Sequence, residues 1–222
     1  YDDHRDLHSF PTRRSSDLFF KSKIKSMMVA DQLEEKNIEG KRHYRKVESQ
    51  QPNSISTHLD GPDRKLLKEN PGLYTNYHGF LLEKTQYSVL ESINNLLGEP
   101  LPAYVDKNFF FGVLIKRGRV LILRIVNRNL PRLPDNIHLL SSLVILVVAK
   151  TQLVSLPELI GRLSHLEHLI LPNNRLQVLP ESVGNLERLT ILNLQSNPLK
   201  ILPQSLENLK KIRELCIDEN LL

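Results

Sequence analysis

The sequence has little of what secreted, membrane-spanning or nucleic-acid-binding proteins rely on. Its single cysteine, Cys216, forms no disulfide within the chain, which favours a reducing, cytoplasmic location. Its longest apolar stretch, Leu139–Ala149, is interrupted by two serines and is too short for a membrane span, which takes about 20 residues. We therefore expect no membrane contact.

Charge of one sign is also scarce in the second half of the chain. The formal net charge is +5, yet residues 120–222 hold 11 Lys and Arg against 9 Asp and Glu, whereas a nucleic-acid footprint needs clustered basic residues. The densest basic run, Lys41–Lys46, has acidic residues on both sides. It predicts a solvated tail more than a contact with nucleic acid or an acidic partner.

Signs of catalysis are missing as well. The sequence has no phosphate-binding glycine loop and no nucleophile elbow. His165 and His168 are three residues apart, but no set of cysteines or carboxylates accompanies them as metal ligands. Cys216 has acidic neighbours, which disfavour its thiolate. We predict that the protein is not an enzyme and holds no cofactor and no metal.

What the sequence does contain is a repeat of 23 residues. Its full form reads L-x-x-L-x-L-x-x-N-x-L-x-x-L-P-x-x-[IV]-G-x-L-x-x, and its clearest copy begins at Leu166. Repeats of this length stack into solenoids, which mostly bind other molecules. The five copies begin at Val120, Leu143, Leu166, Leu189 and Ile212.

Each position that recurs from one repeat to the next has a structural reason. The leucines at positions four and six point inward from a short strand. At position nine, Asn174, Asn197 and Asn220 can satisfy backbone groups in the turn and stack into a ladder, which Thr151 supports only in part and Arg128 does not. The prolines then predict the first turn of a short helix, and the glycines predict close packing between repeats. These residues are Pro134, Pro157, Pro180, Pro203, Gly161 and Gly184.

With this motif, residues 120–222 resemble leucine-rich-repeat proteins, in particular the 23-residue LPxxIG type found in intracellular, Ras-associated scaffold proteins. The segment from Leu97 to Val120 is similar to the lead-in of many prokaryotic members. The resemblance implies an α/β solenoid, with parallel strands on the concave face and short helices on the convex face. It also implies a protein partner on the concave face.

The remaining segments differ in composition. Residues 1–18 resemble a translated sequencing adapter and are excluded from fold prediction, and residues 19–79 are polar, which predicts disorder. Residues 80–119 predict an N-terminal cap that consists of a helix over Phe80–Leu97, ended by Gly98, and a β-hairpin. The hairpin strands are Phe109–Ile115 and Arg119–Val126. The fifth repeat is incomplete at Leu222, so we expect the native protein to continue.

The candidate binding site consists of the side chains that point outward from the repeat strands. Several of these side chains are apolar and predict an exposed stripe. The charged ones among them change from basic near the cap to acidic at the other end. The alternative is that β-branched residues occupy strands for propensity alone. The predicted site residues are Ile122, Arg124, Val126, Asn127, Ile145, Val147, Ala149, Lys150, His168, Ile170, Asn173, Ile191, Asn193, Gln195, Glu214 and Asp218.

Three functions remain open at this point. The first is a non-enzymatic protein-binding module in intracellular signalling or scaffolding, with a small GTPase or another signalling protein as its partner. The second is a regulatory or substrate-recognition arm of a larger enzyme such as a GTPase, kinase or ligase. The third is a structural protein that self-associates.

Overall fold

The computed structural model describes residues 61–104 and 111–218, which all lie in one compact unit, residues 47–222. The predictions for residues 1–60 therefore lie outside the described residues. So do positions 109 and 110 of the predicted hairpin and Asn220 of the predicted ladder.

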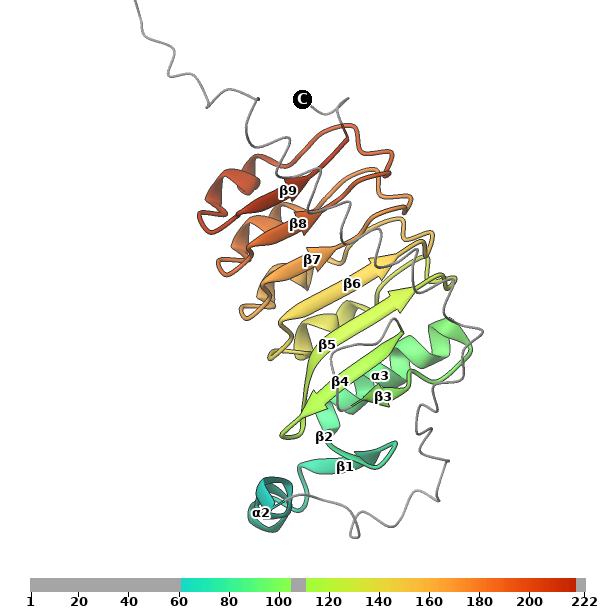
Figure 1. Ribbon diagram of the computed structural model, residues 1–222, viewed down its shortest axis with the longest axis vertical. Helices are drawn as coiled ribbons and strands as arrows, with labels where there is room; N and C mark the ends of the chain where they lie inside the picture. Colours follow the sequence, from blue (N-terminus) through green and yellow to red (C-terminus); the bar gives the residue numbers. More distant parts are fainter. Residues whose placement is uncertain (1–60, 105–110, 219–222) are drawn as a thin grey trace, which may run out of the picture. The chain divides into compact units, whose positions relative to one another are not determined.

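A seven-stranded sheet forms the body of the unit (Figure 1). β4 is antiparallel to β5, and β5 to β9 are all parallel to one another. Ile122 pairs with Ile145, which pairs with His168, so the strand register equals the 23-residue repeat. The strands in order are β3 (Ala103–Tyr104), β4 (Gly112–Lys116), β5 (Arg119–Val126), β6 (Ile145–Ala149), β7 (His168–Ile170), β8 (Ile191–Asn193) and β9 (Glu214–Cys216).

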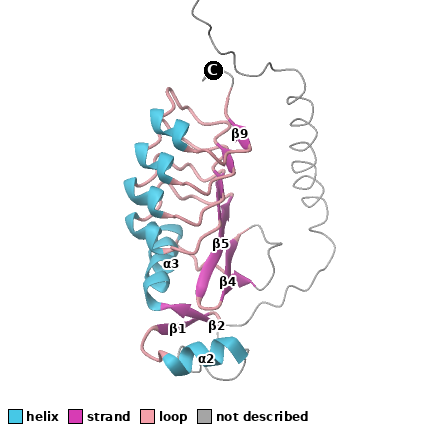
Figure 2. Cartoon of the chain, turned by 90° about the vertical axis from the view of Figure 1, so that its left-hand side faces the viewer, coloured by secondary structure: helices cyan, strands magenta, loops and turns pink. Residues whose placement is uncertain are grey.

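Short 3₁₀ helices lie on the side opposite to the strands (Figure 2). Each follows directly after a proline of the repeat, and Pro157, for example, has a φ of −68° that suits the start of a helix. The predicted short helices are therefore confirmed as 3₁₀ helices of five residues each. They are η1 (Asp135–Leu139), η2 (Glu158–Arg162), η3 (Glu181–Asn185) and η4 (Gln204–Asn208).

The core lies between the strands and the 3₁₀ helices. Leu169 and Leu171, at positions four and six of their repeat, are fully buried, as the pattern predicts. The glycines pack where neighbouring repeats meet, because a Cβ at Gly161 would lie 2.1 Å from the backbone oxygen of Ser182. The repeats thus share one continuous hydrophobic core.

The predicted asparagine ladder joins successive repeats. The buried Asn174 Oδ1 accepts hydrogen bonds from the backbone N–H groups of Thr151 and Leu153 at 3.0 and 3.2 Å, and Nδ2 donates to the Val148 carbonyl at 2.7 Å. Asn197 repeats the arrangement one repeat later. The Thr151 hydroxyl also donates to Asn174 Oδ1, at 2.9 Å.

Arg128 does not join this ladder, as expected. It forms an ion pair with Glu99 and lies over the Phe111 ring, with its guanidinium carbon 4.4 Å from the ring centroid. The side chain is therefore directed toward the cap, and the ladder begins one repeat later.

The cap contains the predicted helix and hairpin, with one correction. The helix, α3 (Lys84–Leu97), ends at Gly98 as expected, but residues 80–83 are the strand β2 (Phe80–Glu83). Leu81 and Leu82 are both buried, and a strand can bury two neighbouring side chains on opposite faces. The four-residue apolar spacing did not distinguish this strand from a first helical turn.

Part of the stretch that was predicted to be disordered is folded. Residues 61–79 contain α2 (Gly61–Glu69) and β1 (Tyr74–Tyr77), and β1 pairs with β2 in a second, two-stranded sheet. Tyr74 and Tyr77 are buried, and the Tyr77 hydroxyl donates to the Leu101 carbonyl at 2.8 Å. The average composition of residues 19–79 is polar, and it did not predict that these two aromatic side chains are buried.

The hairpin connects the cap to the repeats. Arg117 and Gly118 both have positive φ, 52° and 73°, in the two-residue turn between β4 and β5, a geometry that favours glycine. The buried Gln86 Oε1 accepts a hydrogen bond from the Val120 N–H at 2.8 Å. α3 is thereby fixed to the first repeat strand.

Candidate functional site

The outward-facing strand positions form rows that cross the sheet. The 23-residue register places equivalent side chains next to one another on the face opposite to the 3₁₀ helices (Figure 2). Two rows carry most of the predicted site. The first is Ile122, Ile145, His168, Ile191 and Glu214, and the second is Arg124, Val147, Ile170, Asn193 and Cys216.

Most of the predicted apolar stripe is partly accessible. Ile145, Val147, Ile170 and Ile191 are half-buried on adjoining strands, β6, β7 and β8. Val147 and Ile170 are register partners, Ile145 lies two residues before Val147 on β6, and Ile191 on β8 is diagonal to Ile170. We call these four side chains the apolar patch.

Two predicted site residues are buried, which corrects the expected stripe. Ile122 is only 6% exposed, because β5 lies between β4 and β6 and its partners Leu114 and Ile145 lie on both sides. Ala149 is 9% exposed, since its single methyl group does not extend beyond larger neighbours such as Val126. Neither side chain belongs to the exposed part of the stripe.

Position eight of each of the first four repeats has an unusual backbone conformation. Asn127, Lys150, Asn173 and Ser196 all have φ between 54° and 56°, and all are exposed. This left-handed conformation is the one that asparagine tolerates best among residues with a Cβ. The chain therefore turns out of each strand in the same way and presents these side chains at one edge of the face.

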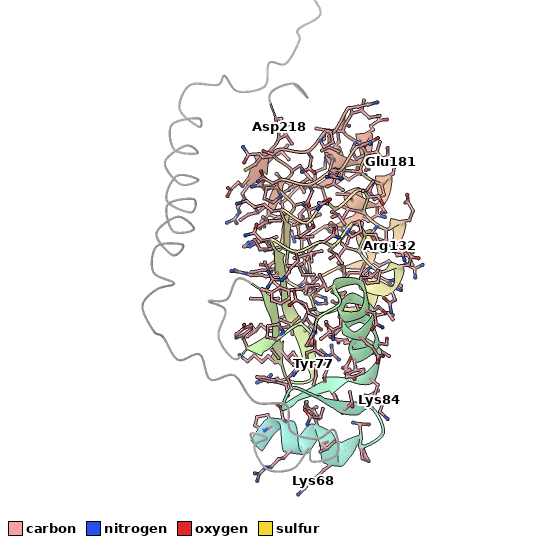
Figure 3. All side chains as sticks on the ribbon, turned by 90° about the vertical axis from the view of Figure 1, so that its right-hand side faces the viewer. Lys68, Tyr77, Lys84, Arg132, Glu181 and Asp218 are labelled. Carbon is pink, nitrogen blue, oxygen red and sulfur yellow. The ribbon has the colours of Figure 1, made fainter. Side chains whose placement is uncertain are left out.

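The ends of the strand face differ in charge, as predicted. Arg124 and Lys150 lie on or next to β5 and β6, whereas Glu214 and Asp218 lie on or next to β9. Figure 3 shows Asp218 on the strand side and Arg132 and Glu181 on the opposite side. Val126 at the basic end, and Asn193 and Gln195 on and after β8, are half-buried.

Two titratable groups on this face favour their neutral forms. Burial lowers the pKa of His168 from its usual value, although the carboxylates of Glu167 and Glu214 oppose that change. Burial, and then the charge of Glu214, raises the pKa of the Cys216 thiol to about 11. The expected poor thiolate is therefore confirmed, with burial as the larger cause.

The structure adds a surface feature that the sequence analysis missed. At the start of β7, β8 and β9 lies an open hollow of about 490 Å³, which we call the rim hollow. The sequence contains one sign of this hollow. Arg188 and Lys211, which are 23 residues apart, both place a basic residue directly before a repeat. The lining residues are Glu167, His168, Arg188, Thr190, Lys211 and Arg213.

Within residues 61–104 and 111–218, no three His, Cys, Asp or Glu side chains are grouped so that they could hold a metal ion. His165 Nδ1 lies 2.9 Å from the Ser141 carbonyl oxygen, a contact within the solenoid. In the same part of the chain, no helix is long and apolar enough to cross a membrane.

Comparison with known proteins agrees with this architecture. Residues 164–222 match a family model described as leucine rich repeat. The ectodomain of the receptor kinase SOBIR1 from Arabidopsis thaliana, also described as leucine-rich-repeat, is 28% identical over 60% of this chain and 78% of its own, with a TM-score of 0.51. The fold is therefore a leucine-rich-repeat solenoid.

Two further solved structures are similar over shorter parts. A leucine-rich-repeat protein of Leptospira interrogans is 32% identical over 43% of this chain, with a TM-score of 0.39, and this chain covers only 25% of its length. The plant peptide hormone receptor RGFR1, solved in complex with RGF2, is 29% identical over 46% of this chain and 17% of its own, with a TM-score of 0.42. No curated protein matched the sequence.

Proposed function

We propose that this chain is a non-enzymatic module that binds a partner protein on the strand face of its repeats. Leucine-rich-repeat domains are generally protein–protein interaction modules, which supports the class of function. The observation that carries the proposal is the apolar patch, Ile145, Val147, Ile170 and Ile191, on three adjoining strands. Accessible apolar side chains in contact with one another commonly mark protein contacts.

The charges around the patch suggest how a partner would be oriented. Among the predicted site residues, basic side chains lie toward β5 and β6 and acidic ones lie at β9, so a partner with the opposite polarity along these positions would bind in one direction. Lys211 and Arg213, which precede β9, are not among these positions. We extend the proposal to a signalling protein, such as a small GTPase, in the cytoplasm. The single buried cysteine supports a reducing compartment.

The test compares two acidic substitutions on the patch with one elsewhere. Peptides selected from a random display library against the wild-type protein would be titrated against Val147→Glu and Ile170→Glu by fluorescence anisotropy. We expect at least about tenfold weaker binding, because burying an unpaired carboxylate opposes contact with an apolar partner. Val178→Glu is the matched control, since Val178 is 54% exposed and lies outside the strands.

Thermal unfolding, followed by circular dichroism, should change little in all three variants. If both patch variants stay folded and keep wild-type affinity for every selected peptide, the strand face is not the binding site.

The second candidate is a recognition or regulatory arm of a larger enzyme. The similar Arabidopsis structure is the ectodomain of a receptor kinase, so repeats of this kind occur in chains that also carry an enzyme. Sequencing the gene beyond the codon for Leu222 tests this candidate. A catalytic domain in the same reading frame would favour it, and a stop codon would contradict it.

A further inference from the structure

Backbone hydrogen bonds between neighbouring repeats run along the rim hollow. The Glu167 carbonyl oxygen accepts hydrogen bonds from the Thr190 N–H at 2.8 Å and from the Thr190 hydroxyl at 3.1 Å. One repeat further on, the Thr190 carbonyl accepts from the Arg213 N–H at 2.8 Å. The backbone of the lining therefore follows the repeat register.

The charge of the hollow is unbalanced. Arg188, Lys211 and Arg213 are exposed and make no ion pair within the described ranges 61–104 and 111–218, and Glu167 is the single carboxylate of the lining. Arg188 lies one repeat before Lys211 and Arg213, so three positive charges line the same hollow. An anion in the hollow would be attracted to all three.

Two cations near the cap have carboxylate partners. Arg119, which occupies the position equivalent to Arg188 and Lys211, pairs with Glu83 at 3.0 Å, and Arg128 pairs with Glu99. The cap supplies both of these carboxylates. Arg188, Lys211 and Arg213 form no such ion pair with another described residue.

We propose that the rim hollow binds the acidic side chains of a partner protein segment that crosses the strand face. The proposal rests on the proposed function and adds the chemistry of one contact. His168 belongs both to the strand face and to the hollow, so a segment on the apolar patch reaches the hollow without leaving the surface. Three cations in about 490 Å³ suit one or two carboxylates.

The experiment uses a fluorescein-labelled hexaglutamate peptide and the full chain in 50 mM NaCl. Lys211→Gln/Arg213→Gln should weaken binding by at least tenfold, and raising NaCl to 200 mM should weaken wild-type binding, because the attraction is screened. Arg175→Gln/Lys200→Gln is the matched control, since it removes two exposed cations outside the hollow and should change affinity less than twofold. Hexaglutamine should not bind.

Several outcomes would overturn the proposal. They are no saturable binding of hexaglutamate, equal loss of binding in both double variants, and tighter binding of decathymidylate or of phosphatidylserine vesicles than of hexaglutamate. A neutral variant of the patch, Val147→Ser/Ile170→Ser, separates the two proposals, because it should retain hexaglutamate binding. If the library-selected peptides bind the strand face while hexaglutamate does not bind, only the rim hollow proposal fails.

Discussion

Replacing Asn174 with alanine would remove the polar link between the second and third repeats. Three backbone groups depend on this side chain, the N–H groups of Thr151 and Leu153 and the carbonyl of Val148. Asn174 is 7% exposed, so water does not readily replace the amide. Each buried polar group that loses its partner costs about 1–3 kcal/mol, and the lower end for all three groups gives about 3 kcal/mol. We expect Asn174→Ala to lower the free energy of unfolding by about 3–5 kcal/mol.

Urea denaturation followed by far-ultraviolet circular dichroism measures this loss. Asn185→Ala is the matched control, because Asn185 is exposed on η3, and it should cost less than about 0.5 kcal/mol. A loss below about 1 kcal/mol for Asn174→Ala, with an unchanged dependence on urea, would refute the argument. It would mean that the three backbone groups find other partners.

Asn174→Asp keeps the shape of the side chain but removes the donor to Val148. Burial and nearby carbonyl oxygens would raise the pKa of the introduced carboxyl above its unfolded value of about 3.9. A group with a raised pKa contributes most stability below its unfolded pKa and loses that contribution as the pH rises through its folded pKa. The difference in unfolding free energy from wild type should therefore be smaller at pH 4 than at pH 7. An equal difference at both pH values would contradict this account.

Two further predictions concern packing and the thiol. Gly161→Ala should lower the free energy of unfolding by about 1–3 kcal/mol, because the added Cβ meets the Ser182 backbone oxygen. Gly72→Ala should not lower it, since no atom lies within 4 Å of a Cβ there. Equal effects of the two substitutions would contradict the packing argument. The pKa of about 11 leaves the Cys216 thiol about a hundredfold less ionised at pH 8 than a thiol with the ordinary pKa of 9.0. Mass spectrometry should show alkylation by iodoacetamide at least about a hundredfold slower in the folded chain than in urea, and similar rates would refute the burial of this thiol.

Local patterns predicted much of this architecture. The 23-residue spacing predicted the strand register from β5 to β9, and the amide chemistry of asparagine predicted the bonds of Asn174 and Asn197. Gly98 predicted the end of α3, and the Lys116–Gly118 segment predicted the hairpin turn. Each of these features depends on side chains and backbone that are close in sequence or related by the repeat.

The wrong predictions depended on contacts between distant segments. Phe80–Glu83 is a strand because β1 pairs with it, and β1 lies in a stretch whose average composition is polar. Ile122 is buried because β4 covers one side of β5, a contact that the repeat pattern does not include. Position within a repeat indicates the direction of a side chain but not what covers it.

The sequence by itself determined the repeat, its strand register, the inward leucines and the asparagine ladder, because a side chain's direction follows from its place in a periodic backbone. Only the tertiary structure decided which outward side chains are accessible and which cations share a hollow. Accessibility and charge repulsion depend on neighbours from other repeats and from the cap. For this reason the burial of Ile122 and Ala149, and the position of Arg188, Lys211 and Arg213 around one hollow, could not be predicted from the sequence.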